Sequence, residues 1–153
     1  MTPVRSKLES LQQRGIYAEE VSPALWESIA GMPHEKELIE KKIVMPLLHP
    51  ELAQKHGVSP PRAILLFGPP GTGKTTFSRG IAGKLGWSFI EVSPAELVRE
   101  GIDRLVVHLR ETFQLLRGLE SSVIFFDEFE EMALRPDGVR TAERMVSNEM
   151  LRQ

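Results

Sequence analysis

The stretch Gly68-Pro69-Pro70-Gly71-Thr72-Gly73-Lys74-Thr75 has the spacing of a phosphate-binding loop. Its glycines allow backbone angles that aim successive N–H groups at phosphate oxygens. Lys74 adds a positive charge near the β- and γ-phosphates, and the hydroxyl of Thr75 is suited to Mg²⁺. The loop opens a helix, whose positive end favours the same anion. We therefore predict that Gly68 to Thr76 binds ATP with Mg²⁺ and that Lys74 contributes to catalysis.

The residues on either side of this loop fit a strand and a helix. The run Ala63-Ile64-Leu65-Leu66-Phe67 is apolar and too short for a typical helix, so it predicts a strand buried on both faces. After the loop, a helix is expected from Lys74 to Leu85, closed by Gly86. Strand, glycine loop and helix therefore follow one another in the order that such a loop requires.

A second motif lies about fifty residues further on, at Val123-Ile124-Phe125-Phe126-Asp127-Glu128. An apolar run that ends in acids describes many strand ends, so this motif is weak by itself. In combination with the loop it becomes specific. We expect Asp127 to hold Mg²⁺, and Glu128 to orient and deprotonate the attacking water.

Strand and helix patterns alternate along the rest of the chain. This alternation predicts an α/β fold of the P-loop NTPase type, with a parallel sheet flanked by helices and the site at the carboxyl ends of its strands. The other elements expected are a polar helix Ser6 to Arg14, an irregular arm Glu19 to Gly31 anchored by Trp26 and Ile29, a helix His34 to Val44 ended or kinked by Pro46, a helix Glu51 to His56, a strand Trp87 to Val92, a helix Arg104 to Arg117 capped by Asp103, a segment Phe129 to Leu134, a turn at Pro136-Asp137-Gly138 and a helix from Thr141.

Composition limits the classes of function. A chain of 153 residues with 41% hydrophobic content suits one domain or a piece of one. The net charge of −2 gives no general attraction for nucleic acid, and there is no cysteine for disulfides or thiolate metal sites. No apolar stretch approaches the roughly 20 residues that span a bilayer. We expect a cytoplasmic protein with no membrane or nucleic-acid partner.

From about Ser22 onward, the chain resembles the AAA group of ATPases. Trp26-Glu27-Ser28-Ile29-Ala30-Gly31 resembles the arm whose backbone meets the adenine, which implies that Ile29 and Gly31 bind ATP. Three further stretches are similar to family segments: Pro46 to Glu51 with Gly57 and Pro61, Phe125 to Glu128, and Arg144-Met145-Val146-Ser147. The resemblance implies a polar arm at residues 1–21 and the N-terminal part of an AAA ATPase core, an incomplete large subdomain, at residues 22–153.

The chain departs from the family pattern in two places. Unfoldase members carry an aromatic residue in a pore loop, where this chain has Gly101-Ile102-Asp103, and a glycine cannot supply the grip of a Tyr or Trp. Either the protein does not thread chains with aromatic side chains, or Ile102 and its neighbours replace the grip. By resemblance, the family continues past the position of Gln153 with a fourth strand, arginine fingers and a helical lid. We therefore expect the 153-residue chain to be a weak ATPase or inactive by itself.

These observations lead to one main hypothesis and two competitors. The main hypothesis is a Mg·ATP-binding core that hydrolyses ATP within a homo-oligomeric ring, a hexamer in the family pattern, to remodel a protein partner that the sequence does not identify. The alternative is a nucleotide-responsive scaffold, in which ATP binding sets the assembly state. A nucleic-acid motor is disfavoured by the net charge and by the acidic side chains of Glu100 and Asp103 beside the pore-loop position.

Overall fold

A computed structural model describes residues 3–13, 16–61, 63–93, 102–117, 119 and 121–127 of the protein. The chain divides into two compact units, one made of Met1–Glu19 and Ile90–Gln153 and the other of Glu20–Phe89. Some predicted features lie outside the described residues: Glu128, Gly101, the segment Phe129 to Leu134, the turn at Pro136-Asp137-Gly138, the helix from Thr141 and the Arg144 to Ser147 stretch.

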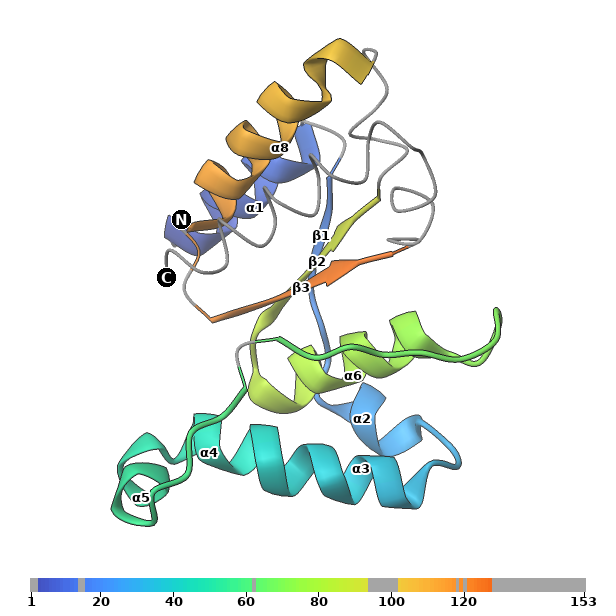
Figure 1. Ribbon diagram of the computed structural model, residues 1–153, viewed down its shortest axis with the longest axis vertical. Helices are drawn as coiled ribbons and strands as arrows, with labels where there is room; N and C mark the ends of the chain where they lie inside the picture. The colour runs from blue at the N-terminus through green and yellow to red at the C-terminus, as the bar shows by residue number, and fades with distance from the viewer. Residues whose placement is uncertain are drawn as a thin grey trace. The chain divides into compact units, whose positions relative to one another are not determined.

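Within the described residues, the sheet has three strands in the order β1-β2-β3 (Figure 1). They are β1 (Tyr17–Glu20), β2 (Ser88–Val92) and β3 (Ser122–Phe126). Strands β2 and β3 run the same way and lie within one residue of their predicted bounds, and β1 runs against them. The predicted α/β class is confirmed, with a mixed sheet. The prediction missed β1 because Tyr-Ala-Glu-Glu has no apolar alternation, and only Ala18 of this strand is buried.

Among the described residues, the helices that pack with this sheet in the same core are α1 (Pro3–Gln13) and α8 (Ile102–Arg117). Phe113 of α8 stacks on Phe126 of β3 with 5.8 Å between ring centroids. The core joins both helices to β1 and β2 through buried apolar side chains: Leu8, Leu11, Ile16, Ala18, Ile90, Val92 and Leu116. Leu8 and Leu11 are therefore structural anchors of an otherwise polar segment. The predicted boundary between residues 1–21 and 22–153 stays a prediction.

Helix α8 differs from its prediction at its N-terminus. It begins at Ile102, so Asp103 lies inside the first turn and is not the N-cap. Its C-terminus is as predicted, at Arg117 directly before Gly118. Ile102 and Asp103 are two of the three residues at the pore-loop position, and their backbone is therefore helical.

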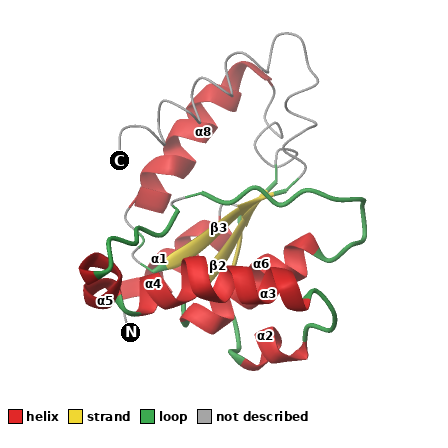
Figure 2. Ribbon diagram, turned by 60° about the horizontal axis from the view of Figure 1, so that its bottom comes forward, coloured by secondary structure: helices red, strands yellow, loops and turns green. Residues whose placement is uncertain are grey.

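The second unit is helical (Figure 2). Its elements are α2 (Ala24–Ser28), α3 (Pro33–Ile39), the π-helix η1 (Glu40–Val44), α4 (Met45–Leu48), α5 (Pro50–Lys55) and α6 (Lys74–Leu85). Helix α6 has the predicted bounds and ends at Gly86, whose φ of 68° is left-handed. The arm predicted as irregular instead contains the end of β1 and all of α2, although Trp26 is buried in it as expected.

Pro46 widens the helix that it was expected to end or kink. Proline has no N–H and its ring crowds the carbonyl four residues earlier, which disfavours a regular α-helical turn. The backbone passes through η1 before Pro46, and the N–H of Met45 bonds to the carbonyl of Glu40, five residues back. The chain then continues into α4, so the helical direction is kept past the proline.

The apolar run Ala63 to Phe67 forms no strand, which contradicts the prediction. Its side chains are solvent-accessible, and Leu65 and Phe67 are 85% and 90% exposed. A strand obtains its backbone hydrogen bonds from neighbours. In the described sheet, β2 already has β1 on one side and β3 on the other, and neither pairs with residues 63–67.

No helix in the described ranges has the length and apolar character that crossing a bilayer requires.

Candidate functional site

The predicted phosphate loop lies directly before α6 and has the backbone that its glycines were expected to provide. Gly71 and Gly73 have φ angles of 78° and 85°, in the left-handed region that side chains with a Cβ avoid. A Cβ built on either glycine would meet no atom within 4 Å. Glycine is therefore required at these two positions by backbone conformation and not by crowding.

The side chain of Lys74 folds back over this loop. Its Nζ donates hydrogen bonds to the carbonyls of Gly68, at 2.9 Å, and Pro69, at 3.2 Å. The hydroxyl of Thr72 donates to the same Pro69 carbonyl at 2.9 Å. The loop is thus closed on itself, with an ammonium group at its centre that can attract a phosphate.

Helix α6 continues from the loop and carries the remaining predicted phosphate and metal ligands. Lys74 and Thr75 are partly buried, whereas Thr76 and the loop residues Pro69 and Pro70 are exposed. Gly73 is the N-cap of α6, and no side chain caps the helix there, so the first N–H groups of the helix, which have no partner within it, lie directly after the loop in the chain. Loop, lysine and helix end together are suited to bind a polyphosphate.

The predicted adenine arm packs on α6. Trp26 is buried, and its ring centroid lies 5.3 Å from that of Phe77 in α6. Ile29 contacts the same helix at Gly80, where an added Cβ would lie 2.6 Å from the Ile29 Cδ1 atom. Gly31 has a φ of 77° and is exposed. The structure therefore brings the arm and the phosphate loop onto one helix.

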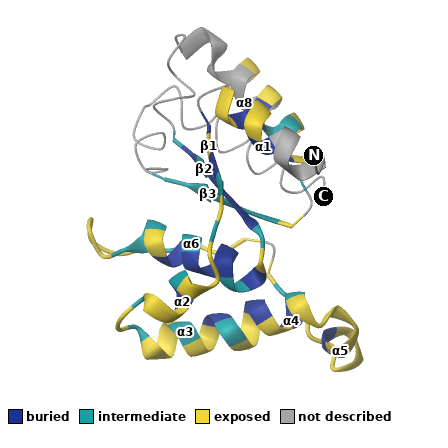
Figure 3. Ribbon diagram, turned by 180° about the vertical axis from the view of Figure 1, so that it is seen from behind, coloured by how far each residue is buried: buried dark blue, intermediate teal, exposed yellow. Residues whose placement is uncertain are grey.

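Gly80 and Gly83 make that packing possible, and they were not identified in the sequence. A Cβ at Gly83 would lie 2.6 Å from the backbone oxygen of Ser22. Figure 3 shows that α6 is largely buried, in contrast to the exposed face of α3. Two glycines three residues apart within a helix, Gly80 and Gly83, indicate a close approach, and this pattern could have been used.

Lys84, near the end of α6, ties the arm and η1 to this helix. Its Nζ lies 2.8 Å from Glu27 Oε1 and 3.2 Å from Glu40 Oε1. The hydrogen bond with Lys84, reinforced by its charge, lowers the pKa of Glu27 below its usual range. The hydrogen bond with Glu27 raises the pKa of Lys84. Glu40 also accepts the indole N–H of Trp26 at 3.0 Å.

Asp127 directly follows β3, as predicted. Its backbone N–H donates to the carbonyl of Val92 at 3.3 Å, which extends the pairing of β3 with β2 to this residue. The aromatic stack at Phe126 fixes the preceding residue. Thr75 and Asp127 both offer oxygen atoms, the ligand type that Mg²⁺ prefers. Within the described ranges, no three His, Cys, Asp or Glu side chains gather as a metal site.

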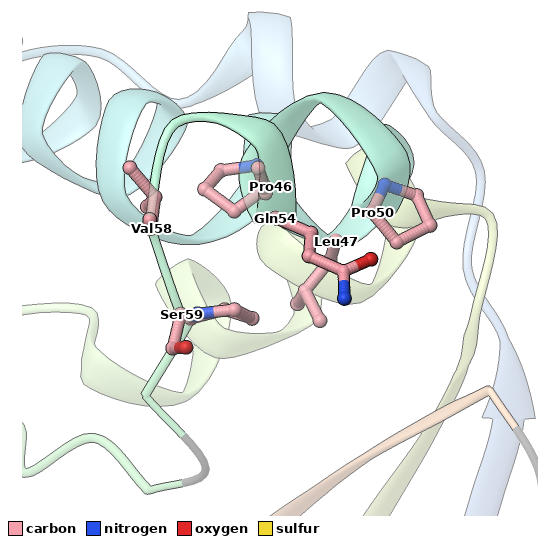
Figure 4. A pocket seen from close by; sticks show the side chains of 9 residues that line it. Pro46, Leu47, Pro50, Gln54, Val58 and Ser59 are labelled. Carbon is pink, nitrogen blue, oxygen red and sulfur yellow. The ribbon is translucent and has the colours of Figure 1, made fainter.

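A separate hollow of about 320 Å³ lies between α4, α5 and the segment after α5 (Figure 4). Its lining is mainly apolar and includes Pro46, Leu47, Pro50 and Val58. None of the predicted site residues lines it.

Comparison with known protein families finds a family model that includes the phosphate loop. The profile of the family described as "ATPase family associated with various cellular activities (AAA)" matches residues 64–153. This match covers more than half of the chain. The chain belongs to the AAA ATPase family. The predicted resemblance is therefore confirmed.

Individual AAA proteins agree with this assignment. The chain is 39% identical over 131 residues to a "Cell division cycle protein 48 homolog" from Archaeoglobus fulgidus, covering 84% of this chain and 18% of that protein. It is 35% identical over 127 residues to a "Proteasome-activating nucleotidase" from Methanocella arvoryzae, covering 82% of this chain and 30% of that protein. The solved structure described as "Structural Basis for Katanin Self-Assembly" matches with a TM-score of 0.69 and 28% identity, covering 94% of this chain and 47% of that one. The chain thus spans less than half the length of these relatives.

Proposed function

We propose that this AAA chain is the nucleotide-binding part of an ATPase that binds Mg·ATP at Gly68 to Thr76 and hydrolyses it. The observation that carries the proposal is the loop itself, in which Lys74 Nζ lies against the Gly68 and Pro69 carbonyls beside the start of α6. Ile29 and Gly31 contribute to binding of the adenine. Family membership supports ATP as the nucleotide.

Each side chain has a distinct role in the proposed reaction. Lys74 moves from the loop carbonyls to the β- and γ-phosphates and stabilises their charge. Glu128 accepts the proton of the attacking water, which is thereby oriented toward the γ-phosphorus. Thr75 and Asp127 would hold Mg²⁺, which when bound neutralises phosphate charge.

The output we propose is remodelling of a protein partner by a homo-oligomeric ring, located in the cytoplasm. The name "Proteasome-activating nucleotidase" describes a relative that acts on a protein assembly, and the katanin structure is described as one of self-assembly. Both support a role for the intact protein as an assembled machine acting on proteins.

A nucleotide-responsive scaffold is the second candidate. It is favoured by Gly101-Ile102-Asp103, which has no aromatic residue at the pore-loop position. In such a protein, nucleotide binding alone would set the assembly state, and hydrolysis would not be needed for its output.

Glu128→Gln in the full-length protein tests this proposal. The substitution keeps the size of the side chain and removes the base, so phosphate release at saturating Mg·ATP should fall by about 10²- to 10⁴-fold while nucleotide binding persists. Phosphate release at the parental rate would contradict the role of Glu128. Cellular function that survives the loss of hydrolysis, together with ATP-dependent assembly, would favour the scaffold.

A further inference from the structure

Lys36 contacts two residues of the predicted adenine arm, Trp26 and Ile29. It lies in α3 and is partly buried. Its Nζ donates a hydrogen bond to the backbone carbonyl of Ile29 at 2.9 Å. The same ammonium lies over the indole ring of Trp26, 5.2 Å from the ring centroid, within the range of a cation–π interaction. The Lys36 ammonium therefore contacts both Trp26, the buried anchor of the arm, and Ile29, whose backbone is extended.

The loop from Ile29 to Met32 has an unusual backbone conformation that a contact such as the one with Lys36 can stabilise. Ile29 leaves α2 with an extended backbone, φ −67° and ψ 111°. Gly31 and Met32 then both have positive φ angles, 77° and 50°. Met32 has a Cβ, and a left-handed conformation is unfavourable for such a residue. Surrounding contacts must hold this conformation, and the Lys36 hydrogen bond closes the loop from the α3 side.

The partners of Lys36 are themselves fixed. Trp26 is 1% exposed, packs at a tilt against Phe77 of α6 and donates its indole N–H to Glu40. Ile29 is seated at Gly80 of the same helix. Helix α6 also begins at the phosphate loop. Through these contacts, Lys36 helps to hold residues 29–31 in a fixed position against α6, the helix that begins at Lys74.

We propose that Lys36 is a positioning residue for the nucleotide base, acting through the Ile29 carbonyl and the Trp26 ring. This role rests on the proposed function, since it assigns the base to residues 29–31. Lys36 holds these residues in their binding conformation before the nucleotide arrives, so the ordering cost is not taken from the binding energy. Its removal weakens binding of a nucleotide and leaves binding of its phosphates unchanged.

The experiment compares two ligands that differ in the base and sugar. Mg·ADP and Mg·pyrophosphate are titrated into the full-length protein, its Lys36→Met variant and its Lys36→Arg variant. Methionine keeps the aliphatic stem and removes the charge and the donors. Lys36→Met should weaken ADP binding by about tenfold, because a charged hydrogen bond is lost, and change pyrophosphate binding by less than about twofold. Arginine can donate and stack, so Lys36→Arg should recover most of the ADP affinity.

A matched control separates position from charge. Lys41 lies in η1, is exposed and pairs with Glu37 four residues earlier. Lys41→Met removes the same charge without touching the arm and should leave both affinities unchanged. Equal weakening of ADP and pyrophosphate by Lys36→Met, or no weakening of either, overturns the positioning role. Failure of the parent protein to bind ADP overturns the proposed function itself, a different outcome.

Discussion

At the scale of single residues, two glycines of α6 have different consequences. At Gly80, the atom nearest to an added Cβ is Ile29 Cδ1 at 2.6 Å, the end of a flexible side chain, and the next is Cε3 of the buried Trp26 ring at 3.2 Å. At Gly83, the nearest atom is the backbone oxygen of Ser22, which cannot move without displacing the chain before α2. The closest contact of the added methyl group is therefore with a side chain at Gly80 and with the backbone at Gly83.

Gly83→Ala should lower the free energy of unfolding by about 1 to 3 kcal/mol, since the helix and the arm must move apart. Gly80→Ala is its matched control. There, a gain of up to about 1 kcal/mol in helix propensity offsets part of the cost of displacing the Ile29 and Trp26 side chains, so the loss of stability should be smaller than at Gly83. Urea denaturation of the two variants measures the difference. A Gly83→Ala variant as stable as Gly80→Ala would contradict the close packing described for α6.

At the scale of elements, local chemistry determined what could be predicted. Helix α6 was predicted with its observed bounds because the glycine loop before it and Gly86 after it are strong local signals for the start and the end of a helix. The phosphate loop was found for the same reason. Pro46 was predicted to end or kink its helix, but the chain accommodates it through η1 and continues into α4, which the sequence does not specify.

Elements that depend on distant partners were not predictable in this way. Residues 63–67 have the composition of a strand, yet strand formation requires a neighbour, and the described sheet provides none. Strand β1 shows the converse, because a polar segment is recruited to the edge of β2. No sequence pattern marks Lys36, because its proposed role depends on three-dimensional contacts with Ile29 and Trp26.

The exposed run at residues 63–67 should make the 153-residue chain self-associate. Leu65 is 85% exposed, and full burial of a leucine contributes about 1.5 to 3 kcal/mol. Leu65→Ser should therefore raise the dissociation constant of the associated form by about 10- to 100-fold, measured by analytical ultracentrifugation. Leu38→Ser, at a half-exposed position of α3, is the control and should have little effect. Equal association of the parent chain and the Leu65→Ser variant would show that this run is not the contact.

At the scale of the whole molecule, the chain is an AAA protein, and the central proposal is that its loop at residues 68–75 binds a nucleotide. If a nucleotide binds at this loop, roles follow for the other residues: the adenine arm, the proposed metal ligands, the catalytic base Glu128 and the positioning residue Lys36. The proposed hydrolysis and ring assembly concern the intact protein, whereas the proposed nucleotide binding depends on residues 68–75, which the described part of the chain includes.

The most direct measurement is therefore a calorimetric titration of Mg·ADP into the protein, into its Lys74→Ala variant and into Lys42→Ala, which removes an exposed lysine of η1. The parent and Lys42→Ala should bind with equal affinity. Lys74→Ala should bind at least about 100-fold more weakly, since the ammonium that stabilises the phosphates is gone. Equal affinity of the Lys74→Ala variant and the parent would contradict the assignment of the loop as the nucleotide site.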